Sequence, residues 1–264
     1  MTQSVTVVDA FTDAPYSGNP AAVCLLSAAR EERWMQQVAR EMNLSETAFL
    51  HPDGDGYRLR WFTPTVEVAL CGHATLAASH VLWESGAAQP ADQLVYQTKS
   101  GRLTARRDGA WIELDFPATP AEAEAPPSNL LEALGVRAKM VARNRFDYLV
   151  EVASEKIVRG LQPDMALLAS VPVRGVVVTA AATTPGFDFV SRFFAPASGI
   201  PEDPVTGSAH ACLGPYWEAR LGKTEMLAYQ ASPRGGMVRV NVKGDRVLLG
   251  GKAVTMMKGE LLAE

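Results

Sequence analysis

Two stretches of the chain are apolar or small at nearly every position. Residues 74–83 read ATLAASHVLW and residues 208–217 read SAHACLGPYW, and each is long enough for a helix. A surface helix carries one apolar stripe, whereas a helix that is apolar all round is buried on all sides. The pattern therefore predicts two buried helices. Pro215 is expected to disturb the second helix near its middle or to end it early.

The segments around these helices follow strand patterns. Apolar and polar positions alternate in residues 57–63, and further strands are expected at residues 5–11, 21–26, 146–152 and 171–179. Shorter helices are expected at residues 31–41, where Trp34, Val38 and Met42 share a face, and at residues 129–134, before Gly135. Residues 43–50 leave the helix at 31–41 and become extended. We therefore predict an α+β fold in which a curved, mainly antiparallel sheet wraps each buried helix.

The two buried helices belong to a repeat. Residues 61–86 and 193–222 each carry an aromatic pair, a proline and a loop to a glycine-containing tetrad, CGHA at 71–74 and TGSA at 206–209. Pro64 and Pro196 lie 132 residues apart, which is half of the 264-residue chain. The repeat predicts two pseudo-symmetric domains, at residues 1–116 and 129–264, joined by a linker at residues 117–128 that is rich in Pro, Ala and Glu. The last strand either stays in the second domain or returns to the first.

The composition is that of an ordinary globular protein, and it argues against several functional classes. Apolar residues make up 47% of the chain and charged residues 20%, and the net charge is −4. No block of Lys or Arg stands out, so neither a nucleic-acid partner nor an anionic membrane surface is expected. The N-terminus lacks a signal-peptide pattern, and no run approaches the roughly 18 apolar residues of a membrane span.

The cysteines and histidines indicate a reducing cytoplasm and show no metal pattern. Three cysteines at unrelated spacings argue against a disulfide framework. No CxxC pair occurs and the four histidines are scattered, so no zinc site is predicted. Nucleotide-dependent chemistry is disfavoured because GxGxxG and GxxxxGK(S/T) motifs are missing. The residues concerned are Cys24, Cys71, Cys212, His51, His73, His80 and His210.

Both tetrads lie where a loop enters a helix. The first amides of a helix lack partners within it and carry partial positive charge, so such an end binds carboxylate or phosphate oxygens. Gly72 and Gly207 would let a ligand approach the backbone closely. The alternative is that these glycines only shape the helix starts. The occurrence of the same device in both halves favours two anion-binding ends that face one small acid.

Two acids are candidates for proton transfer. Glu46 lies among apolar and small residues in NLSETAF, at a change from helix to strand. A partly buried carboxylate would have a raised pKa and could act as base and then as acid near neutral pH. The alternative is an exposed loop residue or part of a helix cap. Asp203 either caps the second buried helix, or it receives a proton or binds a substrate amine.

The first tetrad holds two further reactive side chains. His73 is a proton donor, a hydrogen-bond partner for Glu46 or Asp203, or a structural histidine. Cys71 opens the tetrad at a helix N-terminus, where the pKa of a thiol falls. Four other residues of these types are expected to be structural because they lie within buried elements: Cys24, His80, His210 and Cys212.

Five motifs together give the chain a resemblance to a known family. They are GNPAAV at 18–23, MNLSETAF at 42–49, FTPTVEVALCGHAT at 62–75, SRFFAP at 191–196 and EDPVTGSAH at 202–210. With these motifs in this order, the chain resembles the PhzF family of phenazine-biosynthesis isomerases and their relatives. The resemblance implies the diaminopimelate-epimerase-like fold with an active site between the two domains. It also implies a cofactor-independent isomerase that forms a homodimer.

The resemblance further implies a role for each matching residue. In the phenazine enzyme the acid of the NLSE motif moves a proton between two carbons of a dihydro-hydroxyanthranilate, and this acid corresponds to Glu46. The family's histidine and aspartate, which position the substrate and assist proton relay, correspond to His73 and Asp203. The amides that bind the substrate carboxylate correspond to those of Gly72, His73, Gly207 and Ser208.

Two departures from the relatives bear on the substrate. Epimerase and racemase relatives use two cysteines, one at the first position of each tetrad, but here these positions hold Cys71 and Thr206. A two-thiol reaction is therefore not available, and both residues are assigned to substrate binding. The phenazine enzyme has a small residue where this chain has Cys71, which argues against the phenazine substrate.

Three hypotheses for the function follow. The first is an isomerase of a small carboxylate-bearing metabolite in which Glu46 takes a proton from carbon and returns it on the same face. The second is a Cys71-dependent racemase, lyase or dehydratase, which would lose activity when Cys71 is alkylated. The third is a protein of the same fold that binds a small acid without turning it over.

Overall fold

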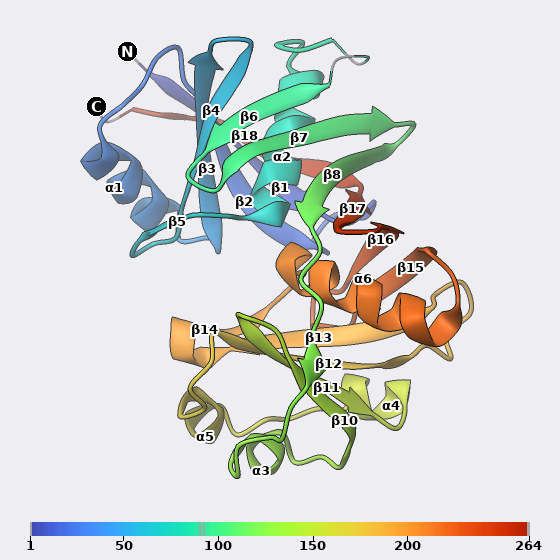
Figure 1. The fold of residues 1–264 in the computed structure, drawn as a ribbon. Helices are drawn as coiled ribbons and strands as arrows, with labels where there is room; N and C mark the ends of the chain where they lie inside the picture. Colours follow the sequence, from blue (N-terminus) through green and yellow to red (C-terminus); the bar gives the residue numbers. More distant parts are fainter. Residues whose placement is uncertain (1, 90, 92, 263–264) are drawn as a thin grey trace. The chain divides into compact units, whose positions relative to one another are not determined.

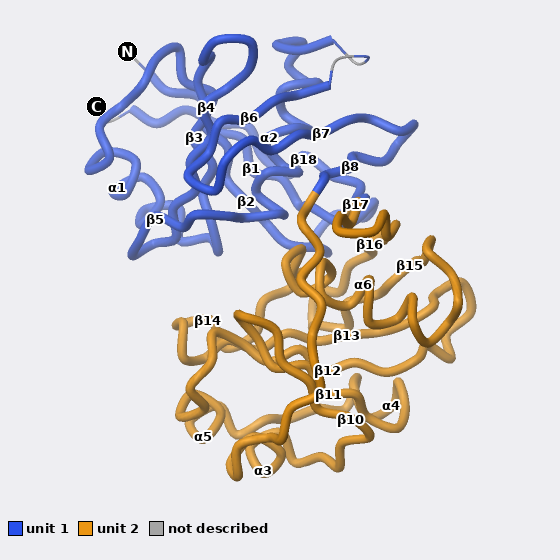
Figure 2. The backbone as a smooth tube through the Cα atoms, in the orientation of Figure 1, with its two compact units in different colours: residues 1–115, 250–264 blue, residues 116–249 orange. Residues whose placement is uncertain are grey.

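The computed structural model describes residues 2–89, 91 and 93–262, and its contacts divide the chain into two units (Figure 2). Unit 1 comprises Met1–Asp115 and Gly250–Glu264, and unit 2 comprises Phe116–Leu249. Residues 117–128, predicted as a linker, belong to unit 2, where β9 (Glu122–Ala123) pairs with β10 (Ala138–Arg143). The last strand, β18 (Ala253–Leu261), pairs antiparallel with β1 (Gln3–Ala10) and so returns to unit 1 (Figure 1).

Unit 1 is a mainly antiparallel sheet around helix α2 (Gly72–Glu84) (Figure 1). Strand β1 pairs antiparallel with β2, β3 with β4, and β6, β7 and β8 follow one another as antiparallel neighbours. Two parallel pairs, β2 with β3 and β4 with β6, enclose the connections that contain the helices. The remaining elements are β2 (Asn19–Leu25), α1 (Glu32–Met42), β3 (Glu46–Asp53), β4 (Gly56–Phe62), β5 (Glu67–Val68), β6 (Leu94–Thr98), β7 (Gly101–Asp108) and β8 (Trp111–Pro117).

Helix α2 is buried as its composition predicts. Residues 73–79 and 81–83 are buried, and the helix packs against β1, β2, β3 and β18. The packing against the returning segment is close, because a Cβ on Gly251 would lie 2.4 Å from Phe11 and 2.6 Å from Leu76. The prediction of a buried helix wrapped by strands is confirmed for unit 1.

Unit 2 repeats these connections in the same order. The antiparallel pair β10 and β11 (Asp147–Val152) is followed by short helices and the parallel pair β11 and β12 (Gly175–Ala181), as β1 and β2 are followed by α1 and β3. Antiparallel β12 and β13 (Phe189–Ala195) then precede helix α6 (Gly207–Leu221) and the parallel pair β13 and β15 (Glu225–Gln230), as β3 and β4 precede α2 and β6. The two pseudo-symmetric α+β domains predicted from the repeat are therefore confirmed.

Unit 2 contains one long buried helix, α6, and several short helices. Helix α6 spans Gly207–Leu221 and is buried at most positions from Gly207 to Trp217. The other elements are α3 (Leu130–Leu134), β11 (Asp147–Val152), α4 (Glu155–Arg159), α5 (Met165–Ala169), β12 (Gly175–Ala181), β13 (Phe189–Ala195), the 3₁₀ turn η1 (Pro196–Ser198), β14 (Ile200–Asp203), β15 (Glu225–Gln230), β16 (Gly236–Lys243) and β17 (Arg246–Gly251).

Helix α6 continues through Pro215, so the alternative that this proline ends the helix early was wrong. A proline has no N–H, which leaves the carbonyl four residues earlier, that of Ala211, without its helical partner. The N–H of Thr119 donates to this carbonyl over 3.1 Å. A segment distant in the sequence thus supplies the missing hydrogen bond, and the helix ends only at Gly222, where φ is 69°.

The strand expected at residues 171–179 also differs from the structure, because β12 begins only at Gly175. Residues 171–174 form a turn after α5, and Pro172 has no N–H for a strand ladder. Val171 nevertheless packs into the core from this turn and is 1% exposed. Among the described residues, no helix is long and apolar enough to cross a membrane.

Candidate active site

The first tetrad forms the start of α2. Cys71 is the residue before the helix, with extended backbone (φ −146°, ψ 115°) and no capping hydrogen bond from its side chain. The first hydrogen bond at this end runs from the Thr75 N–H to the Cys71 carbonyl over 3.3 Å. The N–H groups of Gly72, His73 and Ala74 therefore precede the helix's own ladder, as expected for a helix N-terminus. This end carries the partial positive charge that the sequence analysis predicted.

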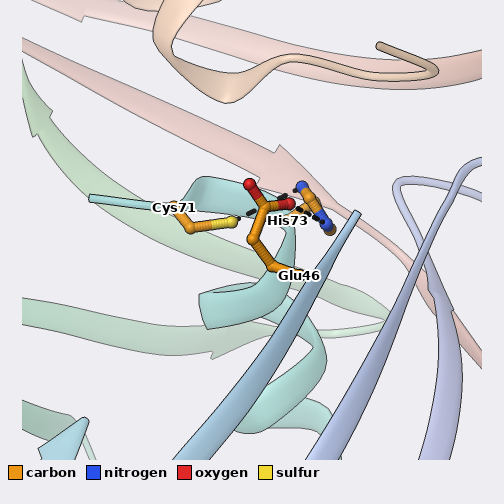
Figure 3. A group of neighbouring side chains, drawn as sticks. All are labelled: Glu46, Cys71 and His73. Atoms are coloured by element: carbon orange, nitrogen blue, oxygen red, sulfur yellow. Dashed lines mark hydrogen bonds and ion pairs between the residues drawn. The ribbon is translucent and has the colours of Figure 1, made fainter. Parts of the chain in front are cut away.

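Glu46 and His73 lie in direct contact at this helix start (Figure 3). Glu46 is the first residue of β3, and it follows Asn43, whose left-handed backbone (φ 50°) ends α1. Its carboxylate Oε2 lies 3.2 Å from His73 Nε2, and the two side chains are only 12% and 5% exposed. The position of Glu46 in an exposed loop, the alternative left open by the sequence, does not occur.

Asn19 contacts the other ring nitrogen of His73, and its role was not predicted from the sequence. Its side-chain Nδ2 lies 3.1 Å from His73 Nδ1, and Asn19 is fully buried at the start of β2. An amide NH₂ only donates, so Nδ1 accepts and the ring proton of a neutral imidazole sits on Nε2, facing Glu46. Burial lowers the pKa of His73 to about 3, which keeps the imidazole neutral. The GNPAAV motif at 18–23, which contains Asn19, was the available signal in the sequence.

Cys71 completes a cluster with these two side chains (Figure 3). Its Sγ lies 3.6 Å from His73 Nδ1, within reach of a weak sulfur hydrogen bond. Cys71 is 7% exposed, so the thiol is almost enclosed by protein. Unit 1 thus brings together Glu46, Cys71, Gly72 and His73, all of which the sequence analysis named.

The second tetrad forms the start of α6 in unit 2. Thr206 precedes the helix with extended backbone, and its hydroxyl donates to Asp203 Oδ2 over 2.5 Å. Gln230 ties this start to β15, because its Oε1 accepts from the Thr206 N–H over 2.9 Å and its Nε2 donates to the Asp203 carbonyl over 2.7 Å. Gln230 is fully buried and was not foreseen from the sequence. Hydrogen bonds therefore connect Asp203, Thr206 and Gln230 at this helix start.

An arginine also lies at the start of α6. Nη2 of Arg174 donates to Ser208 Oγ over 3.1 Å, and the guanidinium makes two hydrogen bonds to Asp147, of 2.9 and 2.5 Å. Asp147 is 2% exposed, and this burial raises the pKa of its carboxyl group although Arg174 opposes the change. The ring of Phe193 packs directly on Gly175, because a Cβ on Gly175 would lie 2.3 Å from the Phe193 ring. Neither Arg174 nor Asp147 was singled out in the sequence.

Among the other histidines and cysteines of the buried elements, His80 and His210 contact protein groups and Cys24 and Cys212 are buried. His210 Nδ1 lies 2.8 Å from the Thr206 carbonyl, and burial lowers the pKa of His210 to about 4. His80 Nε2 lies 3.0 Å from the Thr255 hydroxyl. Burial raises the pKa of the Cys24 and Cys212 thiols to about 12, so both thiols stay protonated and inert near neutral pH.

Comparison with known proteins adds family evidence to this geometry. The family model PhzC-PhzF, described as phenazine biosynthesis-like protein, matches residues 8–259. An uncharacterized isomerase of Halalkalibacterium halodurans is 55% identical over 263 residues and covers 99% of each chain. The human phenazine biosynthesis-like domain-containing protein is 40% identical over 98% of this chain and 99% of its own.

Solved structures agree with the sequence relatives. The crystal structure of a phenazine biosynthesis protein of the PhzF family from Enterococcus faecalis is 41% identical, covers 100% of both chains and superposes with a TM-score of 0.95. The match therefore extends over both units and both tetrads.

Proposed function

Because the chain belongs to the PhzC-PhzF family of phenazine biosynthesis-like proteins, we propose that it is a cofactor-independent isomerase that moves a proton on a small carboxylate-bearing metabolite. Glu46 serves as the single acid and base. The observation that carries this proposal is the nearly buried Glu46 carboxylate, held 3.2 Å from His73 Nε2 at the N-terminus of α2.

The geometry supports a step in which one base acts twice. The Glu46 carboxylate takes a proton from a substrate carbon next to an activating group, and the protonated acid then returns that proton to another carbon on the same face. His73 Nε2 lies 3.2 Å from the Glu46 carboxylate, and in this proposal the imidazole keeps the carboxylate oriented. Asn19 holds His73 in the tautomer that this requires.

The helix starts supply the binding part of the proposal. The N–H groups of Gly72 and His73 at α2, and of Gly207 and Ser208 at α6, offer donors for a substrate carboxylate and for negative charge that develops during proton transfer. In this proposal Asp203 and Thr206 orient the substrate. That both helix starts serve one substrate remains a prediction, as do the homodimer and the cytoplasmic location.

Solvent hydrogen exchange tests the role of Glu46. A panel of small unsaturated and amino carboxylates, including dihydro-hydroxyanthranilates, is incubated with the protein in deuterium oxide and analysed by mass spectrometry. Loss of a general base lowers a rate by roughly 10²- to 10⁴-fold, so Glu46→Gln should stop deuterium uptake at carbon. Glu113→Gln is the matched control, because Glu113 is a buried glutamate of the same unit that pairs with Arg106. Unchanged exchange in Glu46→Gln would remove Glu46 as the base.

One observation favours a second candidate function. Cys71 Sγ lies 3.6 Å from His73 Nδ1 at a helix N-terminus, a position that favours the thiolate form of a cysteine and hence its action as a nucleophile or base. This Cys71-dependent racemase or lyase predicts that Cys71→Ala abolishes turnover of any substrate found in the panel. Retained turnover in Cys71→Ala would eliminate it. Binding without turnover across the whole panel would instead favour a non-catalytic protein that binds small acids.

A further inference from the structure

Glu46, Cys71 and His73 place an oxygen, a sulfur and a nitrogen donor in one small, nearly enclosed cluster (Figure 3). One ligand atom from each residue lies within 4.8 Å of the other two. We propose that these three side chains form a binding site for a thiophilic divalent cation such as Zn²⁺, and that the bound cation switches the enzyme off. The inhibitory part rests on the proposed role of Glu46, whereas the binding part does not.

Two of the donors already stand at a separation that suits a tetrahedral cation. Zinc binds sulfur at about 2.3 Å and imidazole nitrogen at about 2.0–2.1 Å, so two such ligands of a tetrahedral site lie roughly 3.5 Å apart. The distance from Cys71 Sγ to His73 Nδ1 is 3.6 Å. Both residues belong to the start of α2, so the helix backbone keeps them together.

Glu46 provides the third donor by a rotation of its side chain. The carboxylate now contacts Nε2 of His73 at 3.2 Å, on the side of the ring away from Nδ1. To reach a cation at Nδ1 it must leave Nε2 and turn toward Cys71 Sγ, and a ligand atom of each of the three residues already lies within 4.8 Å of the other two. Asn19 Nδ2, at 3.1 Å from Nδ1, gives up its contact when the cation binds. A fourth position remains for water, as in open zinc sites.

The chemistry of the donors selects the class of cation. A thiolate with an imidazole favours Zn²⁺, Cd²⁺ or Co²⁺, whereas Mg²⁺ and Ca²⁺ prefer oxygen ligands only. Cys71 releases its proton to solvent, and the resulting thiolate with the Glu46 carboxylate balances the two positive charges of the cation. This balance matters because Cys71 is 7% exposed and a buried charge without compensation is costly.

Cation binding and proton transfer exclude one another at this cluster. A Glu46 carboxylate bound to a cation cannot accept a proton from a substrate carbon. The cation also occupies His73 Nδ1 in place of Asn19, and Glu46 leaves His73 Nε2. The contact with His73 that orients the Glu46 carboxylate is therefore lost. The cluster therefore acts either as the proton-transfer site or as the cation site.

Cadmium titration of the full chain tests the binding. The sulfur-to-cadmium charge-transfer absorbance in the near ultraviolet should rise to one Cd²⁺ per chain, with release of one proton, and Zn²⁺ but not Mg²⁺ should compete. Cys71→Ser and Cys71→Ala should abolish the absorbance. Glu46→Gln and His73→Asn should weaken binding by about 10- to 100-fold or more, since even an outer-shell partner has an effect of that size. Cys212→Ala, which removes a buried thiol of α6, and Glu113→Gln are the controls that should bind like the parent.

Each outcome decides between the parts of the proposal. Absorbance that persists in the Cys71 variants, or equal affinity in Glu46→Gln, would overturn the site. If the cation inhibits, solvent-exchange activity should fall when it binds and return when a chelator removes it. Binding at the site without such a fall would overturn the inhibitory part of the proposal. If Glu46→Gln keeps its exchange activity, the proposed function fails, yet the cadmium titration still decides whether the cation site exists.

Discussion

The starts of α2 and α6 share one backbone design and differ in their side chains. In both, the residue before the helix is extended and lacks a side-chain cap, and a glycine opens the first turn. At α2 the next side chain is His73, which contacts a nearly buried acid from another strand. At α6 the equivalent position is Ser208, and Thr206 and Asp203 are bonded to each other. The two units thus share the backbone of the helix start, whereas the nearly buried acid and the imidazole lie together in unit 1.

The two helix starts also differ in their charge. The Arg174 guanidinium contacts Ser208 at the N-terminus of α6. A positive charge there is unfavourable by itself, because the helix dipole places partial positive charge at the same end. The buried carboxylate of Asp147 offsets it through two hydrogen bonds. At α2 the acid Glu46 contacts His73 in the first turn. In the proposed function, α6 holds an anion and α2 acts on a proton.

Conversion of the α2 start into a copy of the α6 start should have the largest effect. In the double variant Cys71→Thr/His73→Ser the tetrad reads TGSA, and Glu46 loses the imidazole that orients it. We expect isomerase activity to fall by about 10²- to 10⁴-fold, the range for loss of acid–base assistance. Steady-state rates, with far-ultraviolet circular dichroism to confirm folding, measure this. Adding the reciprocal changes Thr206→Cys and Ser208→His to this double variant should not restore its activity. A gain of activity from them would contradict the proposed difference between the two helix starts.

A smaller loss is expected when only the support of His73 is removed. Asn19→Ala leaves Glu46 and His73 in place but frees the ring to turn, and a misplacement of about 1 Å can reduce a rate by roughly 10²-fold. We therefore expect kcat to fall by about 10- to 100-fold with little change in KM. Gln230→Ala at the α6 start is the comparison, because its loss should act on KM. Equal effects of both variants on kcat would show that the two starts do not divide the work.

A buried carboxylate outside both helix starts, that of Glu155, should make the stability of the protein depend on pH in the acid range. In unit 2, Glu155 accepts hydrogen bonds from the N–H and hydroxyl groups of Thr183 and Thr184, and these bonds hold its pKa well below the usual value of 4.5. Because the folded-state pKa is lowered, the stabilisation is present above about pH 4.5 and is lost progressively as the pH falls below it.

The Glu155→Gln variant measures this contribution. It should be less stable than the parent by about 1–3 kcal/mol at neutral pH, since buried donors lose a charged acceptor. The difference between variant and parent should shrink as the pH is lowered below 4.5. Thermal unfolding at a series of pH values provides the data. A difference that stays constant from pH 7 to pH 3 would contradict the role of the carboxylate.

Much of the fold could be predicted because it follows from local pattern. The all-apolar stretches became α2 and α6, and the repeat became two units with the same order of connections. Pro215 was misjudged because the hydrogen bond that makes it tolerable comes from Thr119, far away in the sequence. The strand at 171–179 was drawn too long because Val171 is buried in a turn, and burial alone does not distinguish a turn from a strand.

The residues that support the candidate site were harder to predict than the residues that form it. Glu46, Cys71 and His73 were named from their residue types and motifs, and the structure brings them together. Asn19 lies 54 positions from His73, Gln230 lies 24 from Thr206, and Arg174 lies 34 from Ser208. Such contacts depend on how strands pair, and neither periodicity nor local motif contains that information. A buried Asn or Gln could have been flagged, but its partner could not have been named.

The central claim is that α2 performs proton transfer and α6 does not. Deuterium uptake at substrate carbon, measured side by side for Glu46→Gln and Asp203→Asn against the parent, tests it most directly. The account predicts that uptake falls by about 100-fold or more in Glu46→Gln. In Asp203→Asn, uptake should continue at saturating substrate with a raised KM. Uptake that survives in Glu46→Gln and disappears in Asp203→Asn would place the base at the start of α6 and contradict the account.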